Sequence, residues 1–268
     1  MESTYTMDQI RRYWTQQADQ HKSSFKASWS DHRAIDLEIH AIAQYIEDGD
    51  KVIDIGCANG YSTVQYAVQK KAHFTGIDFI PDMITEAQTR KDELAGKLRG
   101  RIDFEIGDIL ALNRCREEYD KAVVTRVIIN LNNWENQNKA LQNCAALVKS
   151  GGLLLLSEAT RQGWQKLNKL RRDWGMPDIP VPKFNCYLDE DQVIAALDPV
   201  MRLVELKNFS STYYVGTRVI KPLLSAALGN KVDPADPDME WNRWFSQLPS
   251  WGDYGTQKLF VFEKVRQN

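Results

Sequence analysis

Short apolar runs alternate with longer amphipathic segments between residues 50 and 160 of this 268-residue chain. The short runs, at 51–55, 73–79, 101–106, 121–124 and 153–156, have the length and composition of strands. The segments between them place apolar residues three and four positions apart, which is typical of amphipathic helices. Strands that alternate with helices predict a parallel sheet with helices on both faces.

The segment before this region is amphipathic, and we expect it to form a helical cap over residues 1–48. Tyr13 and Trp14 lie in its first helix, and Ser30 or Asp31 is expected to cap its second helix. In a doubly wound fold such a cap can cover the carboxyl edge of the sheet. Tyr13 and Trp14 then either pack in the core or form an aromatic wall for a cationic ligand.

Beyond residue 160 the pattern predicts a second half, residues 161–268, that completes the sheet. Its last two strands are expected at 201–209 and 255–265. The insertion between them, 210–254, is far longer than a hairpin turn. It contains a helical run at 217–228 and a tryptophan-rich piece, so we expect a folded lid within a single domain.

A glycine-rich turn joins the first strand after the cap to the helix that follows. Its sequence is Asp54-Ile55-Gly56-Cys57-Ala58-Asn59-Gly60-Tyr61, and Ser62 is the expected N-cap of the helix. Glycine accepts positive φ and lets a ligand approach the backbone without meeting a Cβ atom. Such a turn holds a nucleotide-like ligand at the carboxyl edge of a parallel sheet, although the spacing is not the Gly-x-Gly-x-x-Gly of a dinucleotide fold.

Two further acids follow neighbouring strands. Asp78 lies 18 residues beyond Gly60, a distance at which a βαβ unit places a carboxylate on ribose hydroxyls. Asp108 follows the run 101–106, where its carboxylate could accept the amino proton of adenine. Each acid alone is also a common strand-end or turn residue. Together with the glycine turn, they bring three ligand-binding groups to one edge of the sheet.

These three loops resemble the cofactor motifs of class I S-adenosylmethionine-dependent methyltransferases, and the likeness covers residues 50–160. The join Lys149-Ser150-Gly151-Gly152 before the fifth strand is similar to the same family. The resemblance implies a doubly wound α/β fold with a mostly parallel seven-stranded sheet and an antiparallel last strand. It implies S-adenosyl-L-methionine as cofactor, with S-adenosyl-L-homocysteine as product, and assigns residues 49–160 to its binding. The implied cofactor contacts are Asp54, Gly56, Cys57, Ala58, Gly60, Asp78, Phe79, Met83, Asp108, Ile109 and Arg126.

The loop after the fourth strand, residues 125–131, distinguishes subtypes of this family. It lacks the Asn/Asp-Pro-Pro-aromatic signature of enzymes that methylate base amino groups, and no acidic cluster suggests a magnesium site. We therefore expect methyl transfer to an oxygen or nitrogen of a small polar molecule, and arginines in the pocket would favour an anionic one. The expected acceptor-binding residues are Asn130, Asn168, Arg171, Tyr213, Tyr214 and Arg218. Among the candidate bases His21, His32, Glu158 and Tyr187, none stands out.

Composition narrows the setting further. Apolar residues make up 43% of the chain, enough for a sizeable core, and the net charge of −2 argues against a broad grip on nucleic acid or anionic membrane. Cys57, Cys115, Cys144 and Cys186 are scattered, without a metal-binding or disulfide spacing. The chain has no apolar run of membrane-spanning length and no leader sequence after Met1, so we expect a soluble, cytoplasmic protein without a metal.

Three alternatives stay open. A nicotinamide-dependent reductase would share the strand, turn, helix and ribose acid, but it should have a tighter glycine pattern and has no need of Asp108. A non-catalytic binding module would keep the fold and lose the cofactor residues. An RNA methyltransferase is disfavoured by the acidic balance, although residues 97–101 form a basic patch.

Overall fold

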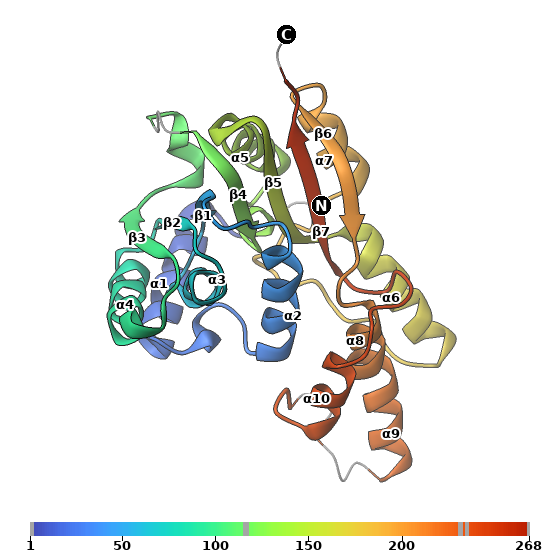
Figure 1. The fold of residues 1–268 in the computed structure, drawn as a ribbon. Helices are drawn as coiled ribbons and strands as arrows, with labels where there is room; N and C mark the ends of the chain where they lie inside the picture. Colours follow the sequence, from blue (N-terminus) through green and yellow to red (C-terminus); the bar gives the residue numbers. More distant parts are fainter. Residues whose placement is uncertain (1–2, 115–117, 230–232, 234–235, 267–268) are drawn as a thin grey trace.

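Seven strands form one sheet in the order β3-β2-β1-β4-β5-β7-β6 in the computed structural model, which describes residues 3–114, 118–229, 233 and 236–266 (Figure 1). The strands are β1 Lys51–Ile55, β2 His73–Asp78, β3 Arg101–Ile106, β4 Tyr119–Thr125, β5 Val148–Ala159, β6 Met201–Lys207 and β7 Gln257–Lys264. Strands β1 to β5 pair in parallel, whereas β7 runs antiparallel to both of its neighbours, β5 and β6. The predicted fold class, a mostly parallel seven-stranded sheet with an antiparallel last strand, is confirmed.

Helices cover both faces of the sheet. The α-helices are α1 Met7–His21, α2 His32–Ala43, α3 Tyr61–Gln69, α4 Pro81–Glu93, α5 Trp134–Leu147, α6 Arg161–Asp173, α7 Glu190–Leu197, α8 Ser211–Val215, α9 Lys221–Ala227 and α10 Glu240–Ser246. Residues of α2 and α3 share one core with the sheet, and residues of α5 and α7 share the other. Consecutive strand residues point to opposite faces, so Val52 of β1 joins the first core and Ile53 the second. Burial on both faces explains why these strands are nearly continuous apolar runs.

The predicted helical cap is present and is joined to the glycine turn. α1 begins with a capping box formed by Thr6 and Gln9, and it contacts α4. The side-chain amide of Asn59 in the glycine turn donates to the carbonyls of Lys22 (2.8 Å) and Ser24 (2.7 Å), between α1 and α2. These two bonds tie the link between the cap helices directly to the predicted cofactor loop.

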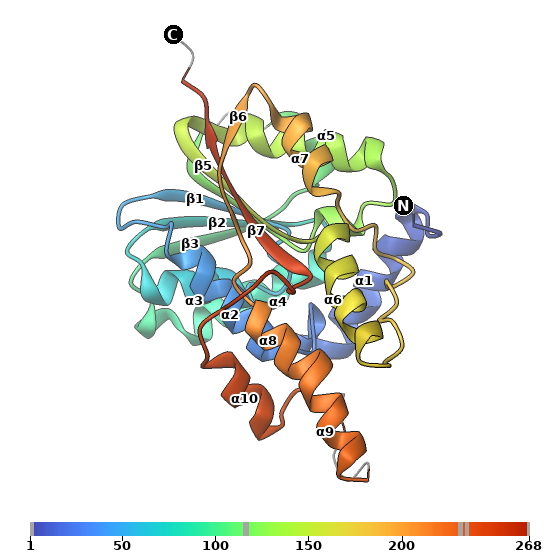
Figure 2. The same ribbon diagram turned by 90° about the vertical axis from the view of Figure 1, so that its right-hand side faces the viewer.

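The insertion leaves β6 at the edge of the sheet where the glycine turn lies, because β6 runs parallel to β5 across the antiparallel β7. It forms α8, a π-helical turn at Gly216–Ile220, and α9, and then returns through α10. These lid helices extend past the end of the sheet, and α10 contacts α2 and α8 (Figures 1 and 2). The lid is helical as predicted, but its helical stretch begins at Ser211, six residues before the predicted start.

Two boundaries around glycines differ from the prediction. Ser62 is not the N-cap of α3: Gly60 occupies that position with φ +70°, and the helix begins at Tyr61. The fifth strand is longer than 153–156, because the chain passes through the Ser150-Gly151-Gly152 segment without leaving the sheet. Gly151 has φ +77°, and the pairing of β5 with β4 shifts register at this point. The segment is thus an irregularity within the strand.

Two further predictions concern the cysteines and membrane-spanning segments. Cys57, Cys144 and Cys186 are buried and form no disulfide among the described residues, and Cys115 lies outside the described residues. Within the described ranges, no helix combines the length and the apolar character needed to cross a bilayer.

Substituting Gly216 by alanine should loosen the lid. The added Cβ would lie 2.2 Å from Cγ of Phe245 in α10, so one of the two helices has to move. Overpacking of this kind costs about 1–3 kcal/mol, and the higher helix propensity of alanine offsets about 1 kcal/mol of that cost. We expect a lower melting temperature in scanning calorimetry.

The matched control is Gly96→Ala, because a Cβ at Gly96 meets nothing within 4 Å. Its melting temperature should stay close to that of the parent chain. If Gly216→Ala melted at the same temperature as this control, α10 would not pack on the π-helical turn.

Candidate functional site

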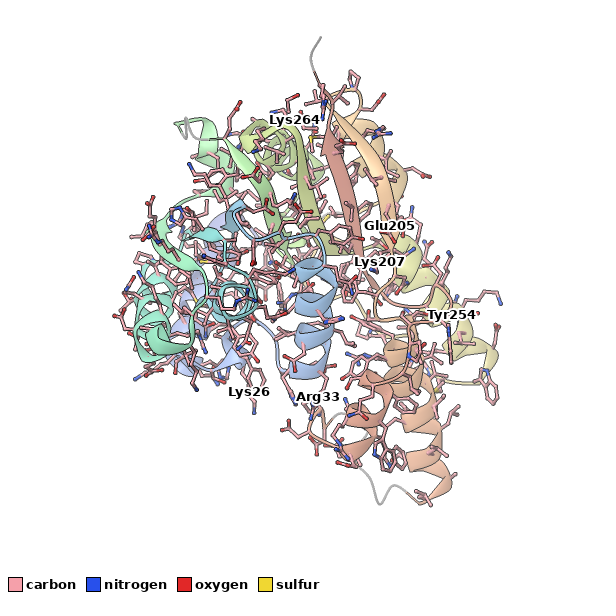
Figure 3. All side chains as sticks on the ribbon, viewed as in Figure 1. Lys26, Arg33, Glu205, Lys207, Tyr254 and Lys264 are labelled. Atoms are coloured by element: carbon pink, nitrogen blue, oxygen red, sulfur yellow. The ribbon has the colours of Figure 1, made fainter. Side chains whose placement is uncertain are left out.

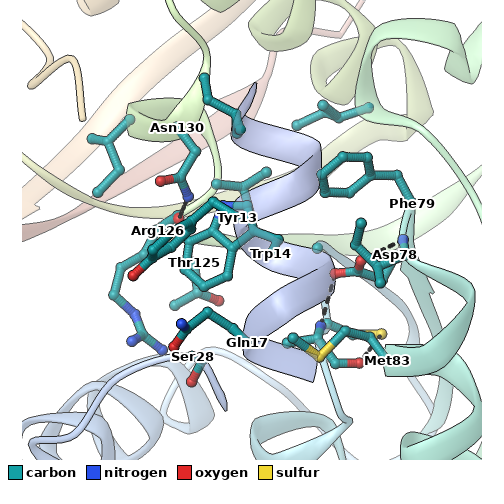
Figure 4. A pocket seen from close by; sticks show the side chains of 18 of the residues that line it. Tyr13, Trp14, Gln17, Ser28, Asp78, Phe79, Met83, Thr125, Arg126 and Asn130 are labelled. Carbon is teal, nitrogen blue, oxygen red and sulfur yellow. Dashed lines mark hydrogen bonds between the residues drawn. The ribbon is translucent and has the colours of Figure 1, made fainter. Parts of the chain in front are cut away.

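A cavity of about 600 Å³ opens at the carboxyl edge of the sheet, against α1 (Figure 4). Its walls come from the glycine turn, the ends of β2, β3 and β4, helix α1 and the segment 182–187. A volume of about 300–1,000 Å³ is usual for a small-molecule site. The predicted cofactor residues that line it are Asp54, Gly56, Cys57, Ala58, Asp78, Phe79, Met83, Asp108, Ile109 and Arg126.

Gly60 is the predicted cofactor residue that does not line this cavity. A Cβ at this position would lie 2.7 Å from the ring of Phe104 in β3 and 2.9 Å from Cβ of Ala87 in α4. Together with its positive φ, this close packing accounts for the glycine. We therefore assign Gly60 to the start of α3 and not to the ligand.

The glycine turn is pinned to the end of β2 by its own backbone. The amides of Gly56 and Cys57 both donate to the carbonyl of Ile77, at 2.7 and 3.0 Å. Gly56 has φ +76°, and a Cβ there would lie 2.2 Å from a methyl group of Val127. These contacts therefore fix the backbone conformation of the turn, one surface of which faces the cavity.

Asp54 links β1 to the helix that follows the turn. It is buried, and its carboxylate accepts a hydrogen bond of 2.5 Å from the hydroxyl of Thr63 in the first turn of α3. Burial raises the pKa of Asp54 to about 6. This contact fixes α3 relative to β1, so Asp54 supports the site as well as lining it.

Asp78 lies at the end of β2 and faces the cavity (Figure 4). One carboxylate oxygen accepts from the amide of Ile80 (2.9 Å) and the other from the amide of Ala58 (3.0 Å). Burial raises the pKa of Asp78 to about 6, although these backbone hydrogen bonds favour the ionised form. Each oxygen keeps a second lone pair, so the carboxylate can also accept from two hydroxyls of a ligand.

The part of the cavity beyond Asp78 is walled by the apolar side chains Phe79, Met83 and Ile109. Asp108 lies at its margin, where its carboxylate accepts from the amide of Leu110 at 2.9 Å. This combination suits a flat aromatic ring that carries a polar edge.

Arg11 of the cap helix α1 also reaches this part, and the sequence analysis missed it. Its guanidinium lies 4.8 Å from the ring centroid of Phe79 and 3.8 Å from a carboxylate oxygen of Asp108. Nothing in the local sequence of α1 indicates this position, because it depends on how the cap docks.

A polar group lies at the opposite end of the cavity from Phe79 and contains Gln17, Ser28, Thr125 and Arg126 (Figure 4). Arg126 has φ +57°, an unusual conformation for a residue other than glycine. Its Nε lies 3.1 Å from a carboxylate oxygen of the buried Glu38, and its guanidinium lies 5.2 Å from the ring of Trp29. The charge of Arg126 is therefore largely balanced from within the protein.

Aromatic side chains of the cap and of the segment 182–187 form another wall of this cavity. Tyr13 stacks on Phe184 with ring centroids 4.5 Å apart, and Trp14 meets both rings edge-on. All three residues line the cavity. Tyr13 and Trp14 thus pack together and also line the cavity, which leaves both predicted roles open to them.

The four candidate bases differ in whether their side chains face a cavity. Glu158 is fully buried, and its carboxylate accepts from the amides of Val127, Ile128 and Ile129 at 2.8, 2.7 and 3.4 Å. Burial raises its pKa to about 8, but its oxygens are occupied by the loop after β4, so it positions that loop. His32 lies 3.4 Å from Asp238 and lines neither cavity described here.

The other two candidate bases do line the large cavity. His21 does so from the last turn of α1. Tyr187 is a poor base near neutral pH, because burial raises its pKa to about 12. Arg33 of α2 lies at the periphery of the molecule and lines neither cavity (Figure 3).

A second cavity of about 170 Å³ adjoins the first beneath the lid, and the two share Trp29, Ile129, Asn185 and Tyr187 as lining residues. Of the predicted acceptor residues, Tyr214 and Arg218 line this second cavity and Asn130 lines the first.

Asn168, Arg171 and Tyr213 line neither cavity. The Asn168 side chain exchanges hydrogen bonds with the backbone of Ile179, and Arg171 donates to the carbonyls of Pro177 and Arg218. The hydroxyl of Tyr213 donates to Asp31 at 2.6 Å. These three residues hold the lid and the loop before α7 in place, which sequence spacing could not distinguish from ligand binding.

No group of three or more histidine, cysteine, aspartate or glutamate side chains is placed to hold a metal ion in the part of the chain that the structure describes.

Comparison with known proteins shows which family and which solved structures the chain resembles. A family described as "Methyltransferase domain" matches residues 46–186. A malonyl-[acyl-carrier protein] O-methyltransferase of Bacillus cereus is 30% identical over 119 residues, which is 44% of this chain and 40% of that protein. A carboxy-S-adenosyl-L-methionine synthase of Nautilia profundicola is 26% identical over 144 residues, 52% of this chain and 57% of that protein. Each match therefore spans only about half of the relative's own length.

Solved structures resemble the whole chain. Magnesium protoporphyrin IX methyltransferase from Synechocystis PCC 6803, crystallised with bound SAH, has a TM-score of 0.55 at 15% identity, over 99% of this chain and 90% of that one. The [4+2]-cyclase SpnF has a TM-score of 0.63 at 15% identity, over 98% and 97% of the two chains. At such identities the likeness establishes the fold alone. The family match, the sheet order and the three loops at its carboxyl edge agree, and this chain belongs to the methyltransferase-domain family, with the class I, Rossmann-like fold.

Proposed function

We propose that this protein transfers a methyl group from S-adenosylmethionine to an oxygen or nitrogen of a small polar molecule. The observation that carries the proposal is the position of Asp78, whose carboxylate faces the large cavity beside the pinned glycine turn. The family match and the relatives named as methyltransferases agree with this reaction. The acceptor of the Bacillus cereus relative is not carried over, because only part of that protein is matched.

The donor set of the cavity fits S-adenosylmethionine. The ribose hydroxyls need two acceptors, and the Asp78 carboxylate offers them. The adenine ring needs apolar faces and an acceptor for its amine, for which Phe79, Met83 and Asp108 are suited. The methionine end is polar and charged, and Gln17 and Arg126 lie in the polar group of the cavity.

When it is bound, S-adenosylmethionine supplies a methyl group already activated on a positively charged sulfur. The protein then has to bind and orient the cofactor and the acceptor and to exclude water. Alignment of these two reactants removes much of the barrier. Aromatic side chains exclude water: Tyr13 and Trp14 of the cap and Phe184 of the segment 182–187 close one wall of the cavity, and their faces attract a cation. Glu158 fixes the loop after β4, whose residue Asn130 lines the cavity.

The finer prediction of an anionic acceptor finds less support. Arg218 is paired with Asp31 at 2.7 Å, Arg126 faces Glu38, and Arg171 donates to two carbonyls. Carboxylates thus balance the charges of Arg218 and Arg126, and Arg171 lines neither cavity. We therefore favour a polar acceptor without net charge.

The fold alone permits other chemistry, as the similar structure named a [4+2]-cyclase illustrates. The nicotinamide alternative is disfavoured, because the glycine turn lacks the third glycine and Asp108 faces the cavity. Calorimetric titration of the purified protein with S-adenosylhomocysteine and with NADH separates these ligands. Saturable binding of NADH without binding of S-adenosylhomocysteine would contradict the proposal.

Asp78→Asn should weaken S-adenosylhomocysteine binding roughly tenfold to hundredfold, because hydrogen bonds to a charged group contribute about 1.5–3 kcal/mol. Isothermal titration calorimetry measures the change. The control is Asp82→Asn, since Asp82 is exposed in the first turn of α4 and lines neither cavity. Equal affinity of the two folded variants would remove Asp78 from the ribose site.

Binding of S-adenosylhomocysteine should also depend on pH. The pKa of Asp78 is raised to about 6 by burial, so the carboxylate is ionised above that pH and becomes protonated below it. Protonation turns one oxygen into a donor, and affinity should fall by up to about tenfold per unit as the pH drops below about 6. Affinity should stay constant above that range.

The same pH series with Asp78→Asn provides the comparison. Its affinity should be lower throughout and should change less with pH; any remaining dependence reports on Asp54, whose pKa is raised into the same range. An identical pH dependence in both proteins would show that Asp78 does not titrate in contact with the ligand.

A further inference from the structure

The second cavity lies between α6, the lid and the end of β5, next to the site proposed for the cofactor. It adjoins the larger cavity through the side chains that both share, among them Trp29, Asn185 and Tyr187. A molecule in it would therefore sit beside the larger cavity, on the opposite side of these residues from Asp78.

The volume of this cavity limits its occupant. At about 170 Å³ it is close to the roughly 150 Å³ of an apolar protein cavity that accepts one benzene molecule. A single ring is therefore the occupant that this comparison supports. The size therefore matches a single six-membered ring.

The walls are suited to a flat ring. Trp29, Trp164, Tyr187 and Tyr214 contribute four aromatic side chains, and Leu167 and Ile179 add aliphatic surface. Trp164 is held in place by a hydrogen bond of 2.7 Å from its indole N–H to the carbonyl of Ile179. Aromatic rings pack favourably against one another in stacked or edge-on geometry.

The charge within this cavity is balanced. Arg218 lines the wall with its guanidinium 4.5 Å from the ring of Tyr214, and it donates to the Asp31 carboxylate at 2.7 Å. Asp31 also accepts from Tyr213 (2.6 Å) and from the amide of Ala34 (3.2 Å). Burial alone would raise the pKa of Asp31, but Arg218 and these hydrogen bonds hold it below its usual value, so both partners are charged and the pair is neutral. An anion entering the cavity would meet no net positive charge.

Two polar groups remain available where the cavities meet. The Tyr187 hydroxyl has no hydrogen-bond partner among the described residues. The amide nitrogen of Asn185 donates to Asn130 at 2.8 Å, which leaves its oxygen to accept from a ligand. A hydroxyl or amino group on the ring could bond to both, and it would then face the larger cavity.

We propose that the second cavity is the acceptor subsite and that it takes a single uncharged aromatic ring, with a hydroxyl or amino substituent held by Tyr187 and Asn185. This inference rests on the proposed methyl transfer and narrows its acceptor to a class. Tyr214 and Arg218, predicted as acceptor residues from the sequence, then serve as wall and as part of a neutral pair.

Three probes test the size and the charge of the site: para-cresol, which is one uncharged ring, para-toluate, which adds a negative charge, and beta-naphthol, which adds a second ring. Binding is measured by saturation-transfer difference NMR on the full-length protein with saturating S-adenosylhomocysteine. We expect para-cresol to bind at least tenfold more tightly than either of the other two. Equal or tighter binding of para-toluate or beta-naphthol would overturn the proposal.

A pair of variants tests the location. Ile179→Phe adds bulk in the wall of the cavity and should weaken para-cresol at least tenfold, whereas Ile220→Phe places the same side chain on an exposed part of the lid and should change nothing. Equal affinity of both variants for para-cresol would place the ring elsewhere and overturn the inference.

Affinity for S-adenosylhomocysteine, measured by calorimetry, should be unchanged in both variants, because Ile179 does not line the larger cavity. This readout separates the two ideas. If Ile179→Phe does not weaken para-cresol binding while S-adenosylhomocysteine still binds, only the proposed subsite is overturned. Failure of the parent chain to bind S-adenosylhomocysteine overturns the proposed function and the acceptor role with it.

Discussion

The site depends on one set of backbone contacts, between the turn after β1 and the end of β2. The carbonyl of Ile77 accepts from two consecutive amides of the turn, and the carboxylate of Asp78 accepts from a third, that of Ala58. Because backbone groups buried without partners are costly, these bonds leave the turn little freedom. They also orient Asp78, so the residue proposed to hold the ribose is fixed by the loop that it stabilises.

The cap and the lid are joined to this centre by buried charges. Glu38 of α2 faces Arg126 in the loop after β4, and Asp31 at the start of α2 faces Arg218 in the lid. Removing one partner of a buried pair leaves an uncompensated charge, which costs far more than the pair contributes. Helix α2 therefore holds elements on both sides of the two cavities, and the arginines that could have bound an anion serve this purpose.

Much of the fold followed from the sequence because its signals are local. Continuous apolar runs such as 153–156 indicate strands buried on both faces, and the long spacing between the last two strands indicated the lid. Two of the boundary errors arose at glycines. Ser62 was a reasonable cap by composition, but Gly60 adopts φ +70° and is the N-cap, so the helix begins two residues earlier than predicted. The Gly151-Gly152 pair, expected to precede the strand, lies within it as an irregularity.

The sequence by itself determined which polar groups meet at the carboxyl edge of the sheet, where the cofactor is proposed to bind. Asp54, Asp78 and Asp108 each lie at or just past the end of a strand, within two residues of it, and parallel strands bring their carboxyl ends to one edge, so spacing along the chain was sufficient. Only the tertiary structure decided the acceptor half. The roles of Arg11, Asn168, Arg171 and Tyr187 depend on contacts between segments far apart in the chain. Whether such a polar residue bonds within the protein or faces a cavity is set by how the cap and lid pack, and no local pattern records that packing.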